Sequence, residues 1–163
     1  MMKRIMVIGC SGAGKSTFSR ALQKKTGLPL YHLDLIWHKP DKTTISREEF
    51  DAALAEIVER EEWFLDGNYG RTLAVRMQKC DTVIFLDIPL EICLQSIEAR
   101  IGEERPDLPW QETELDPEFR AWVEDFPNRS LPKIQALLEQ YREKHIVVLK
   151  SRREMDEYLE ELQ

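Results

Sequence analysis

The sequence GCSGAGKS, at residues 9–16, follows directly on a short apolar run at residues 5–8. A glycine, four residues and then Gly-Lys-Ser, set between an expected strand and an expected helix, is the pattern of a phosphate-binding loop. Gly12 and Gly14 can adopt backbone angles that a Cβ atom forbids, so successive N–H groups can turn toward one phosphate chain. Lys15 would neutralise the outer phosphates, and the Ser16 hydroxyl could bind a bridging Mg²⁺.

The helix expected after this loop adds its positive N-terminal dipole to the same place. The stretch therefore predicts a nucleotide phosphate site. We expect the nucleotide to contact Gly9, Cys10, Ser11, Gly12, Ala13, Gly14, Lys15, Ser16 and Thr17.

The length and the composition are those of an ordinary globular domain. Its 163 residues are 42% hydrophobic and 33% charged, which is typical of a globular protein, and we expect a single domain over residues 1–163. The formal net charge of −7 argues against direct binding to DNA or to an anionic membrane, because both need basic surface. No apolar run approaches the length of a membrane span.

The three cysteines are Cys10, Cys80 and Cys93. Their odd number and irregular spacing do not suggest a disulfide framework, and a reducing, cytoplasmic setting fits them better. Cys10 lies in the phosphate-binding loop, where it could be either a reactive thiol or a small filler residue. Nothing in the composition indicates an oligomeric state.

Strand patterns alternate with helix patterns along the chain, which is typical of a three-layer α/β/α fold with a parallel sheet. We expect strands at residues 4–8, 30–33, 63–65, 82–86 and 146–149. Helices are expected to begin near residues 15, 46, 72, 89, 117, 130 and 151. Two capping boxes are expected, Ser46 with Glu49 and Ser151 with Glu154. Residues 101–117 are rich in proline and glutamate and have no periodicity, and we expect a mobile loop or a short lid there.

Polar residues follow several of the expected strands. Parallel α/β sheets bind ligands at the carboxyl ends of their strands, and Asp34, Asp66, Asn68 and Asp87 stand at such ends. Because these ends meet at one edge of the sheet, the sequence predicts a polar, acidic acceptor side opposite the phosphate-binding loop.

Two of these carboxylates have specific candidate roles. Asp87 follows the most apolar strand, so it could hold Mg²⁺ or hydrogen-bond Ser16, or it could simply cap the helix that begins at Pro89. Asp34 could accept the proton of an acceptor hydroxyl or help to order Mg²⁺, or it could be a turn residue. Trp37 could line an acceptor pocket or pack in the core, and His32 fits a packed strand residue better than a catalytic one.

Several arginines lie where they could neutralise the charge that spreads over a transferred phosphoryl group. Arg71 follows the third expected strand and could face an acceptor anion. Arg100 and Arg105 flank the start of the expected lid, so that closure could bring them over the phosphates. Further along the chain the set contains Arg120, Arg129, Arg152 and Arg153. The last two are near the expected place of a base, and for each arginine the alternative is a solvated surface residue.

Five further segments identify a family resemblance. They are Tyr31-His32-Leu33-Asp34, Asp66-Gly67-Asn68-Tyr69, Phe85-Leu86-Asp87, Phe126-Pro127-Asn128-Arg129-Ser130 and Ser151-Arg152-Arg153. With the phosphate-binding loop, they make the chain resemble the adenylate-kinase-like P-loop proteins, over nearly its whole length. Within these it looks like the small bacterial group called DNA topology modulation proteins.

The resemblance implies a five-stranded parallel sheet in the order 2-3-1-4-5, with ATP or another nucleoside triphosphate as donor and Mg²⁺ as cofactor. By analogy with adenylate kinases, Arg71 would grip an acceptor anion, Arg100 would stack on adenine and Arg105 would contact phosphate. Arg129 would match an arginine that follows the lid. The Thr-Gly-Asp-Met-Leu-Arg segment of adenylate kinases is missing, and residues 34–39 stand in its place, so AMP is not implied as the acceptor.

The resulting hypothesis is ATP-dependent phosphoryl transfer to a nucleotide or another small molecule. The expected catalytic residues are Lys15, Asp34, Arg105 and Arg129. Arg100 and Arg152 would bind the nucleotide, and Ser16 and Asp87 the metal. The acceptor would contact Asp34, Trp37, Asp66, Asn68 and Arg71.

The alternative is a nucleotide-binding regulatory protein of the topology modulation type with little or no turnover. A third possibility is slow ATP hydrolysis without an acceptor. The group name implies an effect on DNA topology, which nothing in these residues explains.

Overall fold

Five parallel strands form one sheet in the order β2-β3-β1-β4-β5 in the computed structural model, which describes residues 2–103, 106, 108–111 and 114–162. The strands are β1 (Arg4–Gly9), β2 (Leu30–His32), β3 (Trp63–Asp66), β4 (Thr82–Leu86) and β5 (His145–Leu149). The expected strand order is therefore confirmed. The central strand β1 pairs with both β3 and β4, so the carboxyl ends of these two strands flank the phosphate-binding loop.

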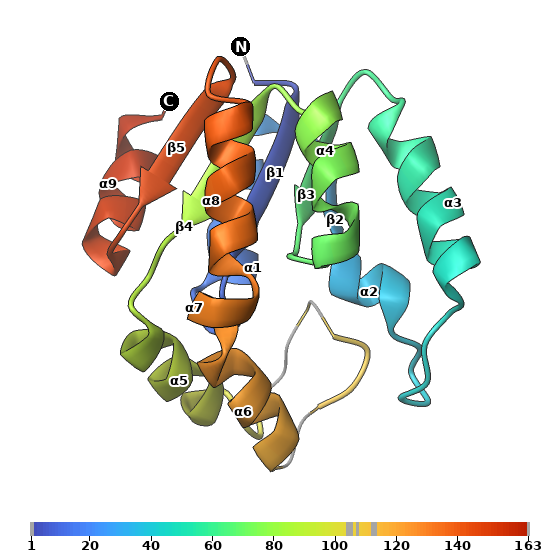
Figure 1. Ribbon diagram of the computed structural model, residues 1–163, viewed down its shortest axis with the longest axis vertical. Coiled ribbons are helices and arrows are strands. Elements are labelled where there is room, and N and C mark those ends of the chain that lie inside the picture. Colours follow the sequence, from blue (N-terminus) through green and yellow to red (C-terminus); the bar gives the residue numbers. More distant parts are fainter. Residues whose placement is uncertain (1, 104–105, 107, 112–113, 163) are drawn as a thin grey trace.

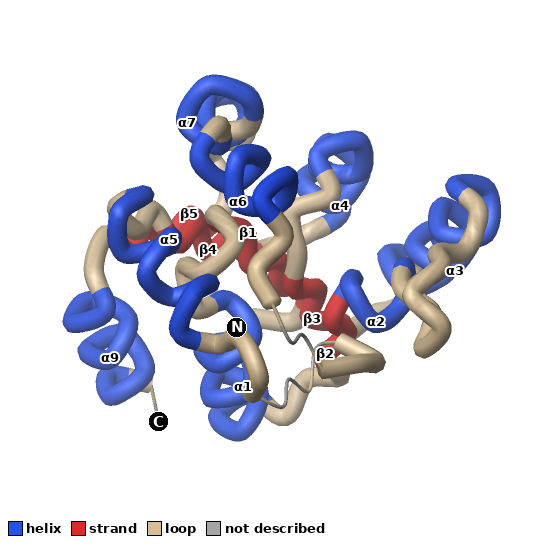
Figure 2. Tube along the Cα trace, turned by 90° about the horizontal axis from the view of Figure 1, so that it is seen from below, coloured by secondary structure: helices blue, strands red, loops and turns tan. Residues whose placement is uncertain are grey.

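Helices cover both faces of the sheet. They are α1 (Lys15–Thr26), α2 (Leu33–Trp37), α3 (Arg47–Val58), α4 (Leu73–Lys79), α5 (Leu90–Ala99), α6 (Pro117–Glu124), α7 (Phe126–Arg129), α8 (Leu131–Gln140) and α9 (Arg152–Glu161), with a 3₁₀ turn at Gly70–Thr72. Figure 1 shows α4 and α8 in front of the strands, and Figure 2 shows α1 and α9 together on the other side. Helices α5 and α6 lie beyond the carboxyl ends of the strands (Figure 1).

The core is built around the three central strands. Every residue of β3 and β4 is buried, as is β1 from Ile5 onward. Strands that are covered on both faces read as continuous apolar runs, which is why these segments were recognisable in the sequence. The burial fixes the positions of the loops that follow the strands.

Local signals set several helix ends. Gly27 ends α1 with a left-handed φ of 73° and donates its N–H to the carbonyl of Gln23. At α3 the expected capping box is present, with Ser46 and Glu49 each accepting from the other's backbone N–H. The second capping box is wrong in one half. Ser151 accepts from Glu154 N–H, but the Glu154 carboxylate accepts from Lys150 N–H.

The segment after β2 differs from the expected strand at residues 30–33. Leu33 is not part of the strand but the first residue of α2, which places Asp34 in the first turn of that helix. Leu33 is fully buried, and its side chain lies against Gly67. The apolar residue thus packs against the loop after β3, while the neighbouring aspartate stays near the open end of the sheet.

The described residues between 101 and 117 form turns and bends, with no helix or strand among them before α6. This segment reaches α2, because Trp110 packs edge-on against His38 with ring centroids 5.1 Å apart. Within the described part of the chain, no helix is both long and apolar enough to cross a bilayer.

Candidate functional site

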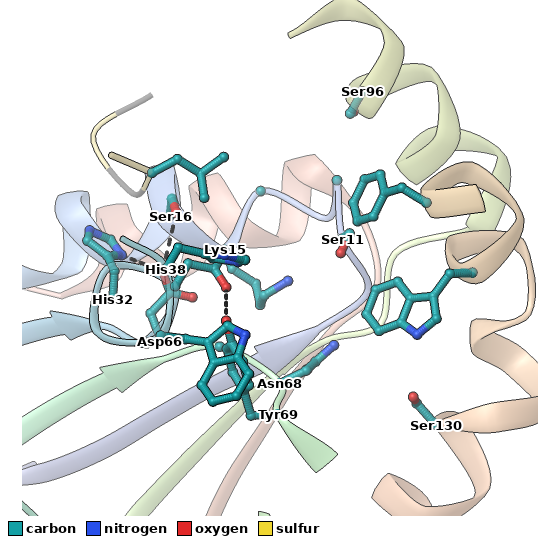
Figure 3. Close-up of a pocket in the computed structure, with 18 of the residues that line it drawn as sticks. Ser11, Lys15, Ser16, His32, His38, Asp66, Asn68, Tyr69, Ser96 and Ser130 are labelled. Atoms are coloured by element: carbon teal, nitrogen blue, oxygen red, sulfur yellow. Dashed lines mark hydrogen bonds and ion pairs between the residues drawn. The ribbon is translucent and has the colours of Figure 1, made fainter. Parts of the chain in front are cut away.

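A cavity of about 1200 Å³ opens at the carboxyl ends of the strands (Figure 3). Most residues that the sequence assigned to a site line it: Ser11, Gly12, Gly14, Lys15, Ser16, Thr17, Asp34, Trp37, Asp66, Asn68, Arg71, Arg100, Arg129 and Arg152. Four others are absent from its lining: Gly9, Cys10, Ala13 and Asp87. Arg105 lies outside the described residues. Residues expected on the donor and acceptor sides therefore share one space.

The phosphate-binding loop has the backbone that its glycines allow. Gly12 and Gly14 have φ angles of 86° and 97°, in the left-handed region where a side chain is strained. The Lys15 ammonium donates to the carbonyls of Gly9 and Cys10, at 3.0 and 3.1 Å. Its charge has only these dipoles as hydrogen-bond partners within the described chain, so a phosphate would be a far stronger partner.

Cys10 is a filler residue in this geometry. Its side chain is 3% exposed. A hydrogen bond with the Cys93 thiol, together with burial, raises the pKa of Cys10 well above that of a free thiol. A buried, protonated thiol is a poor nucleophile, so the reactive alternative is not favoured.

Ser16 and His32 meet at one carboxylate. The Ser16 hydroxyl donates to Oδ2 of Asp66 at 3.3 Å, and Nδ1 of His32 lies 2.7 Å from the same oxygen. Figure 3 shows Asp66 between these two side chains. Asp66 is almost fully buried, with 5% of its side chain exposed. His32 thus takes part in the site, although the sequence favoured a plain packing role.

Asp87 holds a different position. Its backbone N–H pairs with Leu149, and the Ser16 hydroxyl contacts Asp66 rather than Asp87. The capping alternative does not describe it either, because Pro89 is the N-cap residue of α5 and no side chain caps that helix. Its assignment to Mg²⁺ stays a prediction.

Asp34 is oriented by a tyrosine that the sequence analysis had not assigned to the site. The Tyr69 hydroxyl donates to Oδ1 of Asp34 at 2.5 Å. Burial, and then the neighbouring Asp34 charge, raise the pKa of Tyr69 well above its ordinary value, so the hydroxyl keeps its proton. The Trp37 ring packs against Tyr69, with centroids 6.3 Å apart. The carboxylate therefore has one oxygen fixed by a donor.

Asn68 links the loop after β3 to the phosphate-binding loop. Its Oδ1 accepts from Gly9 N–H at 3.0 Å, and its Nδ2 donates to the Gly9 carbonyl. A side chain expected on the acceptor side thus holds the first residue of the donor loop.

No family model matches the chain, and a search of curated proteins finds no relative. Solved structures share its fold. A shikimate kinase from Bacteroides thetaiotaomicron superposes with a TM-score of 0.61 at 18% identity, over 100% of this chain and 97% of that one. A shikimate kinase from Aquifex aeolicus gives 0.56 at 20% identity over 97% and 92%, and a gluconokinase from Sinorhizobium meliloti gives 0.50 at 17% over 98% and 89%.

The fold is that of small P-loop kinases. At identities of 18%, 20% and 17%, the likeness shows the fold alone. This structural likeness does not show membership of the DNA topology modulation group. What this P-loop fold binds must be argued from the side chains of its cavity.

The cavity is basic although the chain as a whole is acidic. The described lining contains seven basic side chains and four carboxylates. The basic ones are Lys15, Arg20, Arg71, Arg100, Arg129, Lys133 and Arg152, and the carboxylates are Asp34, Asp66, Glu103 and Asp116. An excess of positive charge in a concave site favours a polyphosphate ligand.

Arg152 and Arg129 line the cavity from two helices, α9 and α7. Arg152 donates through Nη2 to the Gly12 carbonyl at 2.9 Å and to Oγ of Ser96 at 2.8 Å. The Arg129 guanidinium stacks 3.8 Å above the ring centroid of Trp122. Trp122 is 45% exposed and lines the cavity.

Other arginines fit the surface alternative. Arg120 pairs with Glu98, and Arg153 pairs with a glutamate one turn along its own helix. Neither lines the cavity. Arg71 does line it, while its guanidinium pairs with Asp51 at 2.8 Å.

Several residues that line the cavity were not predicted from the sequence. Arg20 and Lys133 lie on helices, where a single basic residue resembles any solvated one. Tyr69 belongs to one of the segments that carry the family resemblance, and its place in the loop after β3 was the signal that could have assigned it. Ser96 and Ser130 form part of the wall opposite His32 (Figure 3).

Proposed function

We propose that the chain transfers a phosphoryl group from ATP, or another nucleoside triphosphate, to a hydroxyl group of a small molecule. The observation that supports this most is that Lys15 of the donor loop and Asp34, fixed by Tyr69, line the same cavity. Phosphoryl transfer needs a cradle for the donor phosphates and a group that receives the proton of the attacking hydroxyl. The structural neighbours are kinases of small molecules by name, which agrees with this proposal.

On the donor side, the N–H groups of the loop and the N-terminus of α1 would hold the phosphate chain. Lys15 would leave the carbonyls that it contacts and pair with the outer phosphates. Arg152 lies at the Gly12 carbonyl, where it would border the nucleotide, and Arg129 would face the transferred charge. Arg100 lines the same cavity and would contact the base.

The side-chain oxygen atoms near the carboxyl ends of the strands suit the coordination of a magnesium ion. Mg²⁺ prefers oxygen ligands and is usually held by one or two protein groups together with substrate phosphates. Ser16 and the adjacent Asp66 would supply these groups, and Asp87 is the alternative carboxylate. When bound, Mg²⁺ would neutralise charge on the outer phosphates.

On the acceptor side, Asp34 would accept the proton as the hydroxyl oxygen attacks. Tyr69 fixes one carboxylate oxygen, which leaves the other for the acceptor. Trp37 and Asn68 would border the acceptor, and Arg71 would meet an anionic group on it. Arg105 is proposed only by the family analogy, since it lies outside the described residues.

The test is an ADP-release assay with ATP and Mg²⁺ over a panel of nucleosides, nucleotides, polyols and hydroxy acids. At least one acceptor should stimulate ADP release, and Asp34→Asn should reduce that rate by about 10²-fold or more, the usual contribution of a general base. ATP affinity should persist in this variant. Asp156→Asn, on the exposed side of α9, is the matched control and should keep full activity.

Two outcomes would replace the proposal. ATP binding with no stimulation by any acceptor would favour the nucleotide-binding regulatory alternative, to which an effect on DNA topology would then belong. A rate that is the same with and without acceptors would favour ATP hydrolysis.

A further inference from the structure

Arg76 in α4 is a buried cation that the proposed chemistry does not use. Its side chain is fully inaccessible to solvent, while nearly all other basic residues of the described chain reach the surface. Burial lowers the pKa of Arg76 to about 10, so the guanidinium is still charged at neutral pH. Burying a charge is costly unless its partners compensate.

The partners of this guanidinium are uncharged oxygens within the described chain. Nη1 donates to the carbonyl of Gly67 at 2.7 Å. Nη2 donates to the carbonyl of Asn68 and, at 3.4 Å, to that of Tyr69. Nε donates to Oγ1 of Thr72 at 3.2 Å. One side chain thus holds three consecutive carbonyls of the loop at residues 67–69.

That loop joins the two halves of the cavity. The Asn68 side chain makes two hydrogen bonds with the backbone of Gly9, at the start of the donor loop. The next side chain, Tyr69, donates to Asp34 on the acceptor side. Tyr69 has a φ of 31°, a conformation that a non-glycine residue adopts only when its surroundings impose it.

An apolar side chain could fill the space of Arg76, but it could not orient three carbonyls. A lysine would keep the charge, but it lacks the rigid fork of donors that reaches several oxygens at once. A buried guanidinium at residue 76 is therefore explained by the three carbonyl groups that it orients, and not by the filling of space.

We infer that Arg76 is a positioning residue that sets the loop at residues 67–69 and, through Asn68 and Tyr69, the distance between the donor loop and Asp34. This inference rests on the proposed function for its catalytic consequence. Its structural consequence, the fixed Tyr69 hydroxyl, can be measured without any turnover.

The test compares Arg76→Met and Arg76→Lys with Lys79→Met. Lys79 is a partly exposed cation on the same helix, and it pairs with Glu59. Tyrosine ionisation is followed by absorbance at 295 nm as the pH is raised, with circular dichroism to confirm that each variant is folded. In both Arg76 variants we expect one more tyrosine to ionise than in the wild type. Adding Tyr69→Phe should remove that extra tyrosine, and Lys79→Met should match the wild type.

The direction in which the pKa of Tyr69 changes distinguishes release of the loop from loss of the Arg76 charge. The charge of Arg76 itself lowers the pKa of Tyr69, so loss of the charge alone would leave Tyr69 even harder to ionise. Easier ionisation would therefore not come from loss of the charge, and we expect it from release of the loop. If Tyr69 remains un-ionised in folded Arg76→Lys or Arg76→Met, the inference is wrong.

Turnover gives the second readout. With any acceptor that the wild type uses, both Arg76 variants should lose at least tenfold in kcat, and Lys79→Met should lose nothing. Unchanged kcat in a folded Arg76 variant would overturn the inference. If the wild type has no turnover with any acceptor, the proposed function fails, and the tyrosine titration still decides the role of Arg76.

Discussion

Gly12→Ala tests how closely α5 packs on the phosphate-binding loop. Gly12 has a φ of 86°, and a Cβ atom there would lie 2.2 Å from the carbonyl oxygen of Cys93 and 2.9 Å from Cγ2 of Ile97. Gly27 provides a matched control, because its φ of 73° is similar and a Cβ atom there would meet nothing within 4 Å. The two substitutions differ mainly in the space around the new methyl group, which is crowded at residue 12 and open at residue 27.

The expected magnitudes follow from this difference. A left-handed backbone costs an alanine about 1–2 kcal/mol, and both variants bear that cost. Overpacking adds about 1–3 kcal/mol at Gly12 alone, because a carbonyl oxygen at 2.2 Å must move by about an ångström. Gly27→Ala should therefore lower the free energy of unfolding by about 1–2 kcal/mol, and Gly12→Ala by about 2–5 kcal/mol.

The assay is urea denaturation followed by tryptophan fluorescence, together with titration of a fluorescent ATP analogue. Gly12→Ala should also weaken nucleotide binding, since relief of the contact must displace the loop. Gly27→Ala should bind the analogue as the wild type does. Equal stability of the two variants, or undiminished nucleotide binding by Gly12→Ala, would refute the packing of α5 on the loop.

Four further predictions concern local features. Ser46→Ala removes the N-cap of α3 and should lower the free energy of unfolding by about 1 kcal/mol in urea denaturation. Hydrogen bonds from Ser46 lower the pKa of Glu49, so the destabilisation by Glu49→Ala should be full at pH 7 and shrink as the pH falls through that lowered pKa; a constant difference would contradict this. Arg152→Ala should raise the dissociation constant of the ATP analogue severalfold, and an unchanged value would remove Arg152 from the donor site. Cys10 should resist iodoacetamide at pH 8 until the chain unfolds, as mass spectrometry can show, and rapid native labelling would mean a reactive thiol.

The parts of the fold that could be predicted are those specified locally or by continuous burial. The run at residues 82–86 is apolar on both faces and forms β4 with those bounds. The Ser46 and Glu49 pair specifies a helix start through contacts three residues apart. At Ser151 the same spacing gave only half of the motif, because the Glu154 carboxylate accepts from the Lys150 N–H instead.

Helix α2 was missed for a physical reason. Its five residues, Leu33–Trp37, are too few to show a helical period, and the preceding apolar residues match a strand equally well. Packing of Leu33 against Gly67, on a loop distant in the sequence, favours the helix. No local pattern contains that contact.

The choice between Asp66 and Asp87 was also beyond the sequence. Asp66 is the last residue of β3 and Asp87 directly follows β4, and both strands pair with β1, so either carboxylate could have faced Ser16. Side-chain direction at the strand end decides the matter, and it places Asp66 at the hydroxyl. Arg76 gave no signal at all, since one arginine in a short helix resembles a solvated residue until tertiary structure buries it.

The central claim is that one cavity receives both a nucleotide and the molecule that takes its phosphoryl group. The most direct measurement incubates the protein with ATP labelled at the γ-phosphate, Mg²⁺ and the acceptor panel, and then separates the products. We predict label in an acceptor ester, with Lys15→Met and Asp34→Asn each strongly reducing the rate of its formation. Label found only in inorganic phosphate, at a rate that no acceptor changes, would contradict the claim.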